Sequence, residues 1–364
     1  FDRGAHWQPL QLDLPVVPIT DIKVYRKDLV VSTMGRSFWI LDDISVLHQI
    51  NDQTASAQAF LFRPRDSYRA RWTGSLERRF SGYSPEYPPG GVMVHYHLSH
   101  DAQDELKLDV LDSEDRVVRS YSARPRSAGA EEPDQGMRFP RRGRGTASLS
   151  TQAGMHRLVW DLEHAPPPNA PRGGATAVPG RYQVRLTLGQ WSQTQEFDLL
   201  IDPRVADDGV TIDDLRAQFQ LVQRLGRSWG RARSAVERIG SVRGQLQSVA
   251  ENARRAELEE AVSKRADQLA RQLTEIEELL VQTEEGKVGA QLEPQLMGQM
   301  SYLWSMVTGA DQRPAKSAYD RLDDIEEVLQ GLQDRLSRLL KDDIAAFNKQ
   351  LREQKLGPVI FNQP

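Results

Sequence analysis

The sequence contains no cysteine, which excludes disulfide bonds, thiolate metal sites and cysteine nucleophiles from its 364 residues. It has no uninterrupted apolar run of about 18 residues, so it predicts no helix that spans a bilayer. It also lacks a glycine-rich phosphate loop, a nucleophile elbow and a His-Glu-x-x-His zinc motif. We therefore expect no membrane span and no cofactor.

An excess of one charge is absent as well. The 47 Lys and Arg residues nearly balance the 51 Asp and Glu residues, which leaves a formal net charge of −4. A near-neutral chain has no general attraction for polyanions, so we expect no nucleic-acid binding. The length predicts two or three domains, each long enough to bury a core of its own.

The first seven residues, FDRGAHW, contain most of an Asp-box motif in Asp2, Gly4 and Trp7. The opening Ser or Thr of that motif would lie one residue before Phe1. In an Asp box the carboxylate accepts N–H groups of a hairpin turn, the glycine adopts a backbone conformation costly for other residues, and the tryptophan packs under the turn. Such hairpins belong to β-propellers, so we expect the chain to begin inside a repeated hairpin.

Short strands follow the Asp box. Three apolar stretches between residues 19 and 47 are separated by polar turns around Lys27 and Gly35, and a last strand precedes Pro64. Together with the Asp box, these strands predict that residues 1–66 form the last blade or blades of a truncated Asp-box β-propeller.

Residues 67–205 also have the pattern of strands. Apolar and polar residues alternate over Val92–Leu98 and Tyr182–Leu188, as in half-buried strands. Gly189–Gln190 fits the two-residue turn of a type II′ hairpin. Six or seven strands of this kind predict an immunoglobulin-like β-sandwich. Residues 123–150 are crowded with Gly, Pro, Ser and Arg and lack apolar periodicity, so we expect a mobile loop there.

The apolar period lengthens to between three and four after residue 205. Thr211, followed three residues later by Asp214, resembles a capping box with Asp in place of the usual Glu. Further apolar stripes run over residues 258–280, 292–307 and 322–339, the last as a heptad seam. Because long amphipathic helices are stabilised mainly by burying such stripes, residues 206–364 predict an antiparallel four-helix bundle.

One pair of histidines has the spacing of a metal site. His95 and His97 lie two residues apart in a predicted strand, so both imidazoles project from one face, as in some strand-borne zinc sites. A third ligand is required, and the sequence identifies none. Val94, Tyr96 and Leu98 predict the buried face of the same strand, which leaves the histidines on the opposite face.

The predicted blade offers few candidates for chemistry. Arg36, between Gly35 and Ser37, either contacts an anionic ligand at a propeller mouth or forms a salt bridge or carbonyl contact at a blade turn. Asp42 and Asp43 are adjacent on a strand, so their side chains point to opposite faces and do not form the facing carboxyl pair of a glycosidase. We expect capping or turn roles for both carboxylates.

Two further features have alternative readings. Trp160 and Tyr182 are aromatic residues of the kind that stack on sugars, but their strand phase favours core packing. Arginines gather around the predicted mobile loop, where a solvated loop and a site for an acidic polysaccharide are the alternatives, and only Phe139 is available there for stacking. These arginines are Arg119, Arg124, Arg126, Arg138, Arg141, Arg142 and Arg144.

Read in order, the Asp box, the stretch DLVVSTMGRSFWILDD and the pair VPGRY and IDPR resemble the C-terminal part of bacterial sortilin-type BNR-repeat exoproteins. The resemblance covers nearly the whole chain. It implies one or two Asp-box propellers, then an immunoglobulin-like domain and a terminal helical segment. It also implies a secreted, periplasmic or cell-envelope location. Members of this family are often labelled glycosyl hydrolases.

Two classes of function remain open. The first is a non-catalytic C-terminal region that supports the end of a propeller and offers surfaces to a protein partner or to a second copy of the chain. The second is part of a glycan-acting hydrolase whose active site lies on blades upstream of residue 1. Fold analogy alone does not assign an activity.

Overall fold

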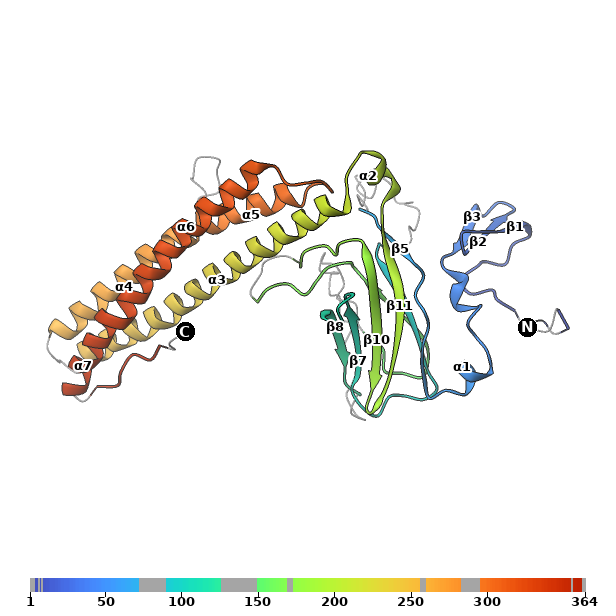
Figure 1. The fold of residues 1–364 in the computed structure, drawn as a ribbon. Helices are drawn as coiled ribbons and strands as arrows, with labels where there is room; N and C mark the ends of the chain where they lie inside the picture. Colours follow the sequence, from blue (N-terminus) through green and yellow to red (C-terminus); the bar gives the residue numbers. More distant parts are fainter. Residues whose placement is uncertain are drawn as a thin grey trace. The chain divides into compact units, whose positions relative to one another are not determined.

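The protein is a mixed β plus α chain, seen here in a computed structural model (Figure 1). It divides into two compact units, one of Phe1–Leu162 with Gly180–Leu200 and one of Glu163–Pro179 with Ile201–Pro364. The three-way division predicted at residues 66 and 205 stays a prediction. The structure describes residues 4, 5, 7, 9–71, 90–125, 149–168, 173–255, 260–282, 295–354 and 356–361. Most of the predicted mobile loop lies outside these residues.

The first unit begins with a three-stranded sheet. Strands β1 (Ile19–Tyr25), β2 (Asp28–Thr33) and β3 (Phe38–Leu41) follow one another in antiparallel order. Two residues with positive φ, at 48° and 68°, connect β1 to β2, which is the backbone of a type I′ hairpin turn. A short 3-10 helix, η1 (Ile44–Val46), and one helical turn, α1 (Asp52–Ser56), lead out of this sheet.

Two further sheets complete the first unit. One has five strands in the order β5-β11-β10-β7-β8, and the other has three in the order β4-β6-β9. The strand bounds are β4 Ala59–Leu61, β5 Ser67–Arg69, β6 Val92–Leu98, β7 Leu106–Leu111, β8 Val117–Ala123, β9 Gly154–Trp160, β10 Gly180–Leu188 and β11 Trp191–Ile201.

Aromatic residues join the inner faces of these two sheets. The ring of Trp160 on β9 lies 5.3 Å from that of Tyr182 on β10 and 6.2 Å from that of Phe197 on β11, measured between centroids. All three side chains are buried, so the predicted core role of Trp160 and Tyr182 is confirmed. The hairpin predicted at Gly189–Gln190 is also confirmed, because Leu188 pairs directly with Trp191 and Gly189 has a φ of 57°.

The second unit is mainly helical. Its elements are α2 (Pro203–Asp207), α3 (Ile212–Arg255), α4 (Glu260–Leu280), α5 (Leu296–Val307), α6 (Lys316–Arg338), the π-helical segment η3 (Leu339–Ile344) and α7 (Ala345–Glu353). The predicted stripes of α4 and α6 are buried in one hydrophobic core that also receives side chains from α3, α5 and α7. The long α3 contacts α4, α5 and α6, and α7 packs on η3.

The capping box predicted at the start of α3 is confirmed. The backbone N–H of Thr211 donates to Asp214 Oδ2 at 2.9 Å, and the N–H of Asp214 donates to Thr211 Oγ1 at 3.2 Å. Two N–H groups that the first helical turn leaves without intrahelical partners are thereby satisfied.

A proline-rich segment packs closely on α3. A Cβ atom added at Gly226 would lie 2.8 Å from Pro167 Cγ, and one added at Gly230 would lie 3.0 Å from the carbonyl oxygen of Pro168. The two glycines are one helical turn apart, so they form one flat strip of helix surface. Their lack of side chains lets the segment around Pro167 approach the helix backbone.

Candidate functional site

The Asp-box residues lie at the start of the first unit, where Asp2 is outside the described residues. Gly4 has a φ of 91°, and the indole Nε1 of Trp7 donates a hydrogen bond to its carbonyl oxygen at 3.0 Å. The Trp7 ring also lies against Gly4, since a Cβ added there would be 3.7 Å from the ring. Trp7 is nevertheless 88% exposed, so these contacts are local to the turn, and the Asp-box hairpin stays a prediction.

Arg36 lies at the turn between β2 and β3. Its carbonyl oxygen accepts a hydrogen bond from Trp39 Nε1 at 3.0 Å, and Gly35 before it has a φ of 84°. The Arg36 side chain is exposed and has no ion-pair partner among the described residues. Contact of this guanidinium with an anionic ligand stays a prediction.

Asp43 has the structural role expected of it. Its φ is 58°, and its carboxylate caps η1 by accepting hydrogen bonds from the backbone N–H of Ser45 at 3.2 Å and from Ser45 Oγ at 2.5 Å. The N–H of Asp43 donates to Asp28 Oδ1, which also receives Arg65 Nη1 at 2.6 Å. The carboxylates of Asp28 and Asp43 are therefore engaged in holding the exit from the first sheet.

His95 and His97 project from the same face of β6, opposite the buried Val94 and Tyr96. The pKa of His95 is lowered, mainly by burial. The negative charge of Asp43 acts in the opposite direction, and the positive charge of Arg157 also lowers the pKa. His97 Nδ1 is buried and has no hydrogen-bond partner in the described part of the chain. Within those same residues, no three His, Asp or Glu side chains are grouped as a metal site requires. Zinc binding by this pair stays a prediction.

Both faces of the first sheet carry apolar side chains that are not buried, and one face holds a continuous row of them. The pairing of Ile22 with Val31 and of Val31 with Trp39 places these three side chains on one side, and Val24, Leu29 and Leu41 extend the row. None of the six is buried, and Ile22 and Val24 are 60% and 59% exposed. We call these six residues the apolar sheet face.

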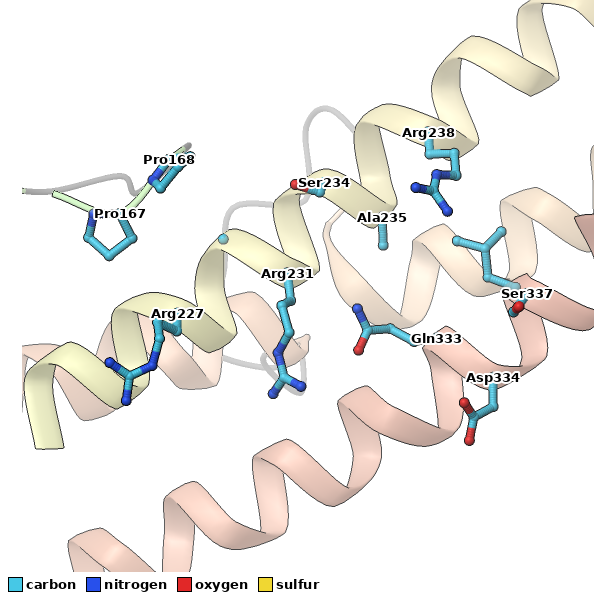
Figure 2. A pocket seen from close by; sticks show the side chains of 12 residues that line it. Pro167, Pro168, Arg227, Arg231, Ser234, Ala235, Arg238, Gln333, Asp334 and Ser337 are labelled. Carbon is cyan, nitrogen blue, oxygen red and sulfur yellow. The ribbon is translucent and has the colours of Figure 1, made fainter. Parts of the chain in front are cut away.

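A groove lined by arginines lies between α3 and α6 in the second unit. Figure 2 shows Arg227, Arg231 and Arg238 projecting from α3, whereas Gln333, Asp334 and Ser337 project from α6. Its volume is about 650 Å³, the size of a small-molecule site. We call this cavity the arginine groove. Its remaining lining residues are Pro167, Pro168, Gly230, Ser234, Ala235 and Leu336.

The ion pairs around the arginine groove leave two of its three arginines without a carboxylate. Arg231 lies 3.9 Å from Glu326, and Arg224 binds the same carboxylate. Burial raises the pKa of Glu326, but hydrogen bonds from Arg224 and Ser228 outweigh burial and hold the pKa below its ordinary value, so Glu326 is ionised. Arg227 and Arg238 have no ion-pair or hydrogen-bond partner among the described residues.

The arginine groove was not predicted from the sequence, although α3 carries a signal for it. Arg227, Arg231, Ser234 and Arg238 are separated by four, three and four residues, which places them on one side of a helix. The opposite wall comes from residues about 100 positions later, and no local pattern indicates that α6 packs there. The arginines of the predicted mobile loop, by contrast, lie outside the described residues apart from Arg119 and Arg124.

No protein-family model and no curated protein sequence matches this chain. None of the helices in the described part of the chain combines the length and the apolarity that a membrane-spanning helix needs.

Proposed function

We propose that this chain is a non-catalytic support and interaction region, built as the C-terminal part of a sortilin-type BNR-repeat propeller protein of the cell envelope or exterior. In this proposal the sheet of β1–β3 belongs to a propeller blade, and residues 206–364 form an antiparallel helical bundle. The strand that precedes Pro64, expected in the blade, is β4 and pairs with β6, so it is part of the immunoglobulin-like sandwich that continues to residue 205. The chain supports the propeller and offers surfaces to a protein partner or a second copy.

The apolar sheet face carries this proposal. A three-stranded sheet needs cover on at least one side for stability, and six neighbouring apolar side chains are left open to water on this one. Contiguous apolar patches on soluble proteins mark contact surfaces. A propeller blade packs its faces against neighbouring blades, so another sheet of the same kind is the occupant that fits.

Further observations support the other two parts of the proposal. In the two sheets that meet at Trp160, the pairs β10–β11, β10–β7, β7–β8, β4–β6 and β6–β9 are antiparallel, as expected for an immunoglobulin-like sandwich. The common hydrophobic core of α3, α4, α5 and α6 suits a bundle. Asp43 caps η1 and Asp28 pairs with Arg65, so both carboxylates are engaged in structural contacts, which favours support over hydrolysis there.

Sedimentation velocity of the full chain over a concentration series tests the proposal. If the apolar sheet face packs against another sheet, the chain should self-associate through this face. The double variant I22T/V24T should then weaken the association by about tenfold or more, because two apolar side chains are lost from the contact. Threonine keeps the β-branched shape that suits a strand.

Ile40→Thr is the matched control. Ile40 lies on β3 with an exposure of 58%, but it points to the opposite side of the sheet from Ile22. The control should associate as the original chain does. A chain that stays monomeric at every concentration, or equal losses in both variants, would overturn the role of this face. Cleavage of a glycoside panel by the full chain would overturn the non-catalytic part of the proposal.

A further inference from the structure

The three guanidinium groups of the arginine groove form a row. Arg227, Arg231 and Arg238 follow one another at four and seven residues, so they lie within about 40° of one another around the helix and span about 16 Å along it. Arg227 and Arg238 lack a carboxylate partner among the described residues. A guanidinium group that has no carboxylate partner in the protein can donate two hydrogen bonds to a carboxylate, sulfate or phosphate group.

The opposite wall of the groove offers both hydrogen-bond acceptors and donors. Gln333 offers an amide, Ser337 a hydroxyl and Asp334 a carboxylate (Figure 2). Gln330 Nε2 donates to Asp334 Oδ1 at 2.9 Å, and Oδ2 has no partner among the described residues. A ligand that presented only negative charge would be repelled at Asp334. The groove therefore suits a ligand with anionic groups along one side and hydroxyl groups along the other.

We infer that the arginine groove binds a linear oligosaccharide that carries carboxylate or sulfate groups. The acidic substituents pair with Arg227 and Arg238, and the sugar hydroxyl groups donate to Asp334 and exchange hydrogen bonds with Ser337. The sugar rings rest on the aliphatic surface of the groove.

Two properties of the lining favour this ligand class. Ala235, Leu336, Pro167 and Pro168 contribute apolar surface to the lining of the groove. Its described lining includes no aromatic side chain on which a nucleobase would stack.

This inference is independent of the proposed propeller contact, because the groove and the apolar sheet face lie in different units.

Isothermal titration calorimetry of the full chain at low salt provides the test. The probes are an oligogalacturonate, a sulfated heparin-derived oligosaccharide and a neutral gluco-oligosaccharide of the same length. We expect at least one charged oligosaccharide to bind, whichever acidic group is preferred, and the neutral one to bind about tenfold more weakly or not at all. Raised salt weakens the charged interaction by screening it.

Arginine variants locate the binding. Arg227→Gln, at an exposed position, should weaken binding of the charged oligosaccharide by about tenfold, the loss of one charge-assisted contact. Arg271→Gln is the control, because Arg271 is an exposed arginine of α4 outside the groove and without an ion-pair partner among the described residues. It should leave affinity unchanged, and equal effects of the two substitutions would overturn the site.

Asp334→Asn separates a sugar from a simple polyanion. If sugar hydroxyl groups donate to the carboxylate, the variant binds the charged oligosaccharide more weakly. If charge alone matters, removing Asp334's negative charge strengthens binding of both the oligosaccharide and an oligoglutamate peptide. That second result, or tighter binding of the peptide than of either charged oligosaccharide, would overturn the inference.

Discussion

The side-chain amide of Gln245 binds both backbone polar groups of Ile360. Its Nε2 donates to the carbonyl oxygen of Ile360 at 2.8 Å, and its Oε1 accepts from the N–H of Ile360 at 2.7 Å. Asn348 holds the adjacent Val359 in the same way, at 2.9 and 2.7 Å. Two side-chain amides, one on α3 and one on α7, thus satisfy the backbone N–H and C=O groups of two consecutive residues in the segment 356–361.

The two amides should contribute unequally to stability. Asn348 and Val359 are buried, so Asn348→Ala leaves a buried N–H and carbonyl without partners and should lower the free energy of unfolding by about 1–3 kcal/mol. Gln245→Ala leaves the N–H and C=O of Ile360 without a side-chain partner, but water can hydrogen-bond to both. The free energy of unfolding should therefore fall by less than about 1 kcal/mol. Urea denaturation of both variants checks this order. A larger loss from Gln245→Ala would contradict it.

Two glycines of α3 should respond in opposite directions to the same change. Gly226→Ala places a methyl group 2.8 Å from Pro167 Cγ and 3.5 Å from Trp304 Cζ3, so it should destabilise the protein by about 1–3 kcal/mol through overpacking. Gly240→Ala meets no atom within 4 Å and should stabilise it by about 0.5–1 kcal/mol, because alanine favours the helix. Chemical denaturation of the two variants measures both signs, and stabilisation by Gly226→Ala would contradict the close packing of the proline segment.

Asp109 should make stability depend on pH. Burial raises its pKa, but hydrogen bonds from Ser120, Lys107 and Arg185 at 2.7, 2.9 and 3.2 Å outweigh burial and lower the pKa below 3.8. Because the folded pKa is the lower one, the stabilisation is present in full above the unfolded pKa and is lost as the pH falls through the folded pKa. Asp109→Asn should therefore cost about 1–3 kcal/mol at pH 7, with the difference shrinking below about pH 4.

The control for Asp109 lies on the same sheet. Asp198 is 47% exposed and lies 3.7 Å from Arg181, so Asp198→Asn should change stability by less than about 1 kcal/mol at pH 7. Thermal melts of the three proteins from pH 3 to pH 7 provide the comparison. A constant difference between Asp109→Asn and the original chain across this range would rule out the carboxylate as its cause.

Helices and strands that are marked by a pattern among neighbouring residues could be predicted from the sequence. Alternation over Val92–Leu98 marks β6 and its buried face, and the Thr211–Asp214 pair marks the start of α3. Each signal comes from neighbouring residues and from a period of two or 3.6. The core position of Trp160 followed from its strand phase in the same way.

Contacts between residues far apart in the sequence could not be predicted from local patterns. The approach of Pro167 to Gly226 joins positions 59 residues apart, and the sequence of α3 gives no reason to pair that glycine with a proline. The arginine groove is similar, because the row on α3 could be read from spacing but the wall that carries Asp334 depends on how α6 packs. Backbone binding by the amides of Gln245 and Asn348 likewise depends on where the segment 356–361 returns.

The first sheet should be the least protected part of the chain against hydrogen exchange. All seven residues of β1 are exposed and none of β2 or β3 is buried, whereas α3 places 14 residues in buried positions. Amides open at a free energy set by the burial that their local unit provides, so the amides of β1–β3 should exchange well before those of α3. Mass spectrometry of exchanged peptides measures the two regions in one sample. Equal protection would mean that the apolar sheet face is already covered in the isolated chain, and protection that rises with protein concentration would mean that a second copy covers it.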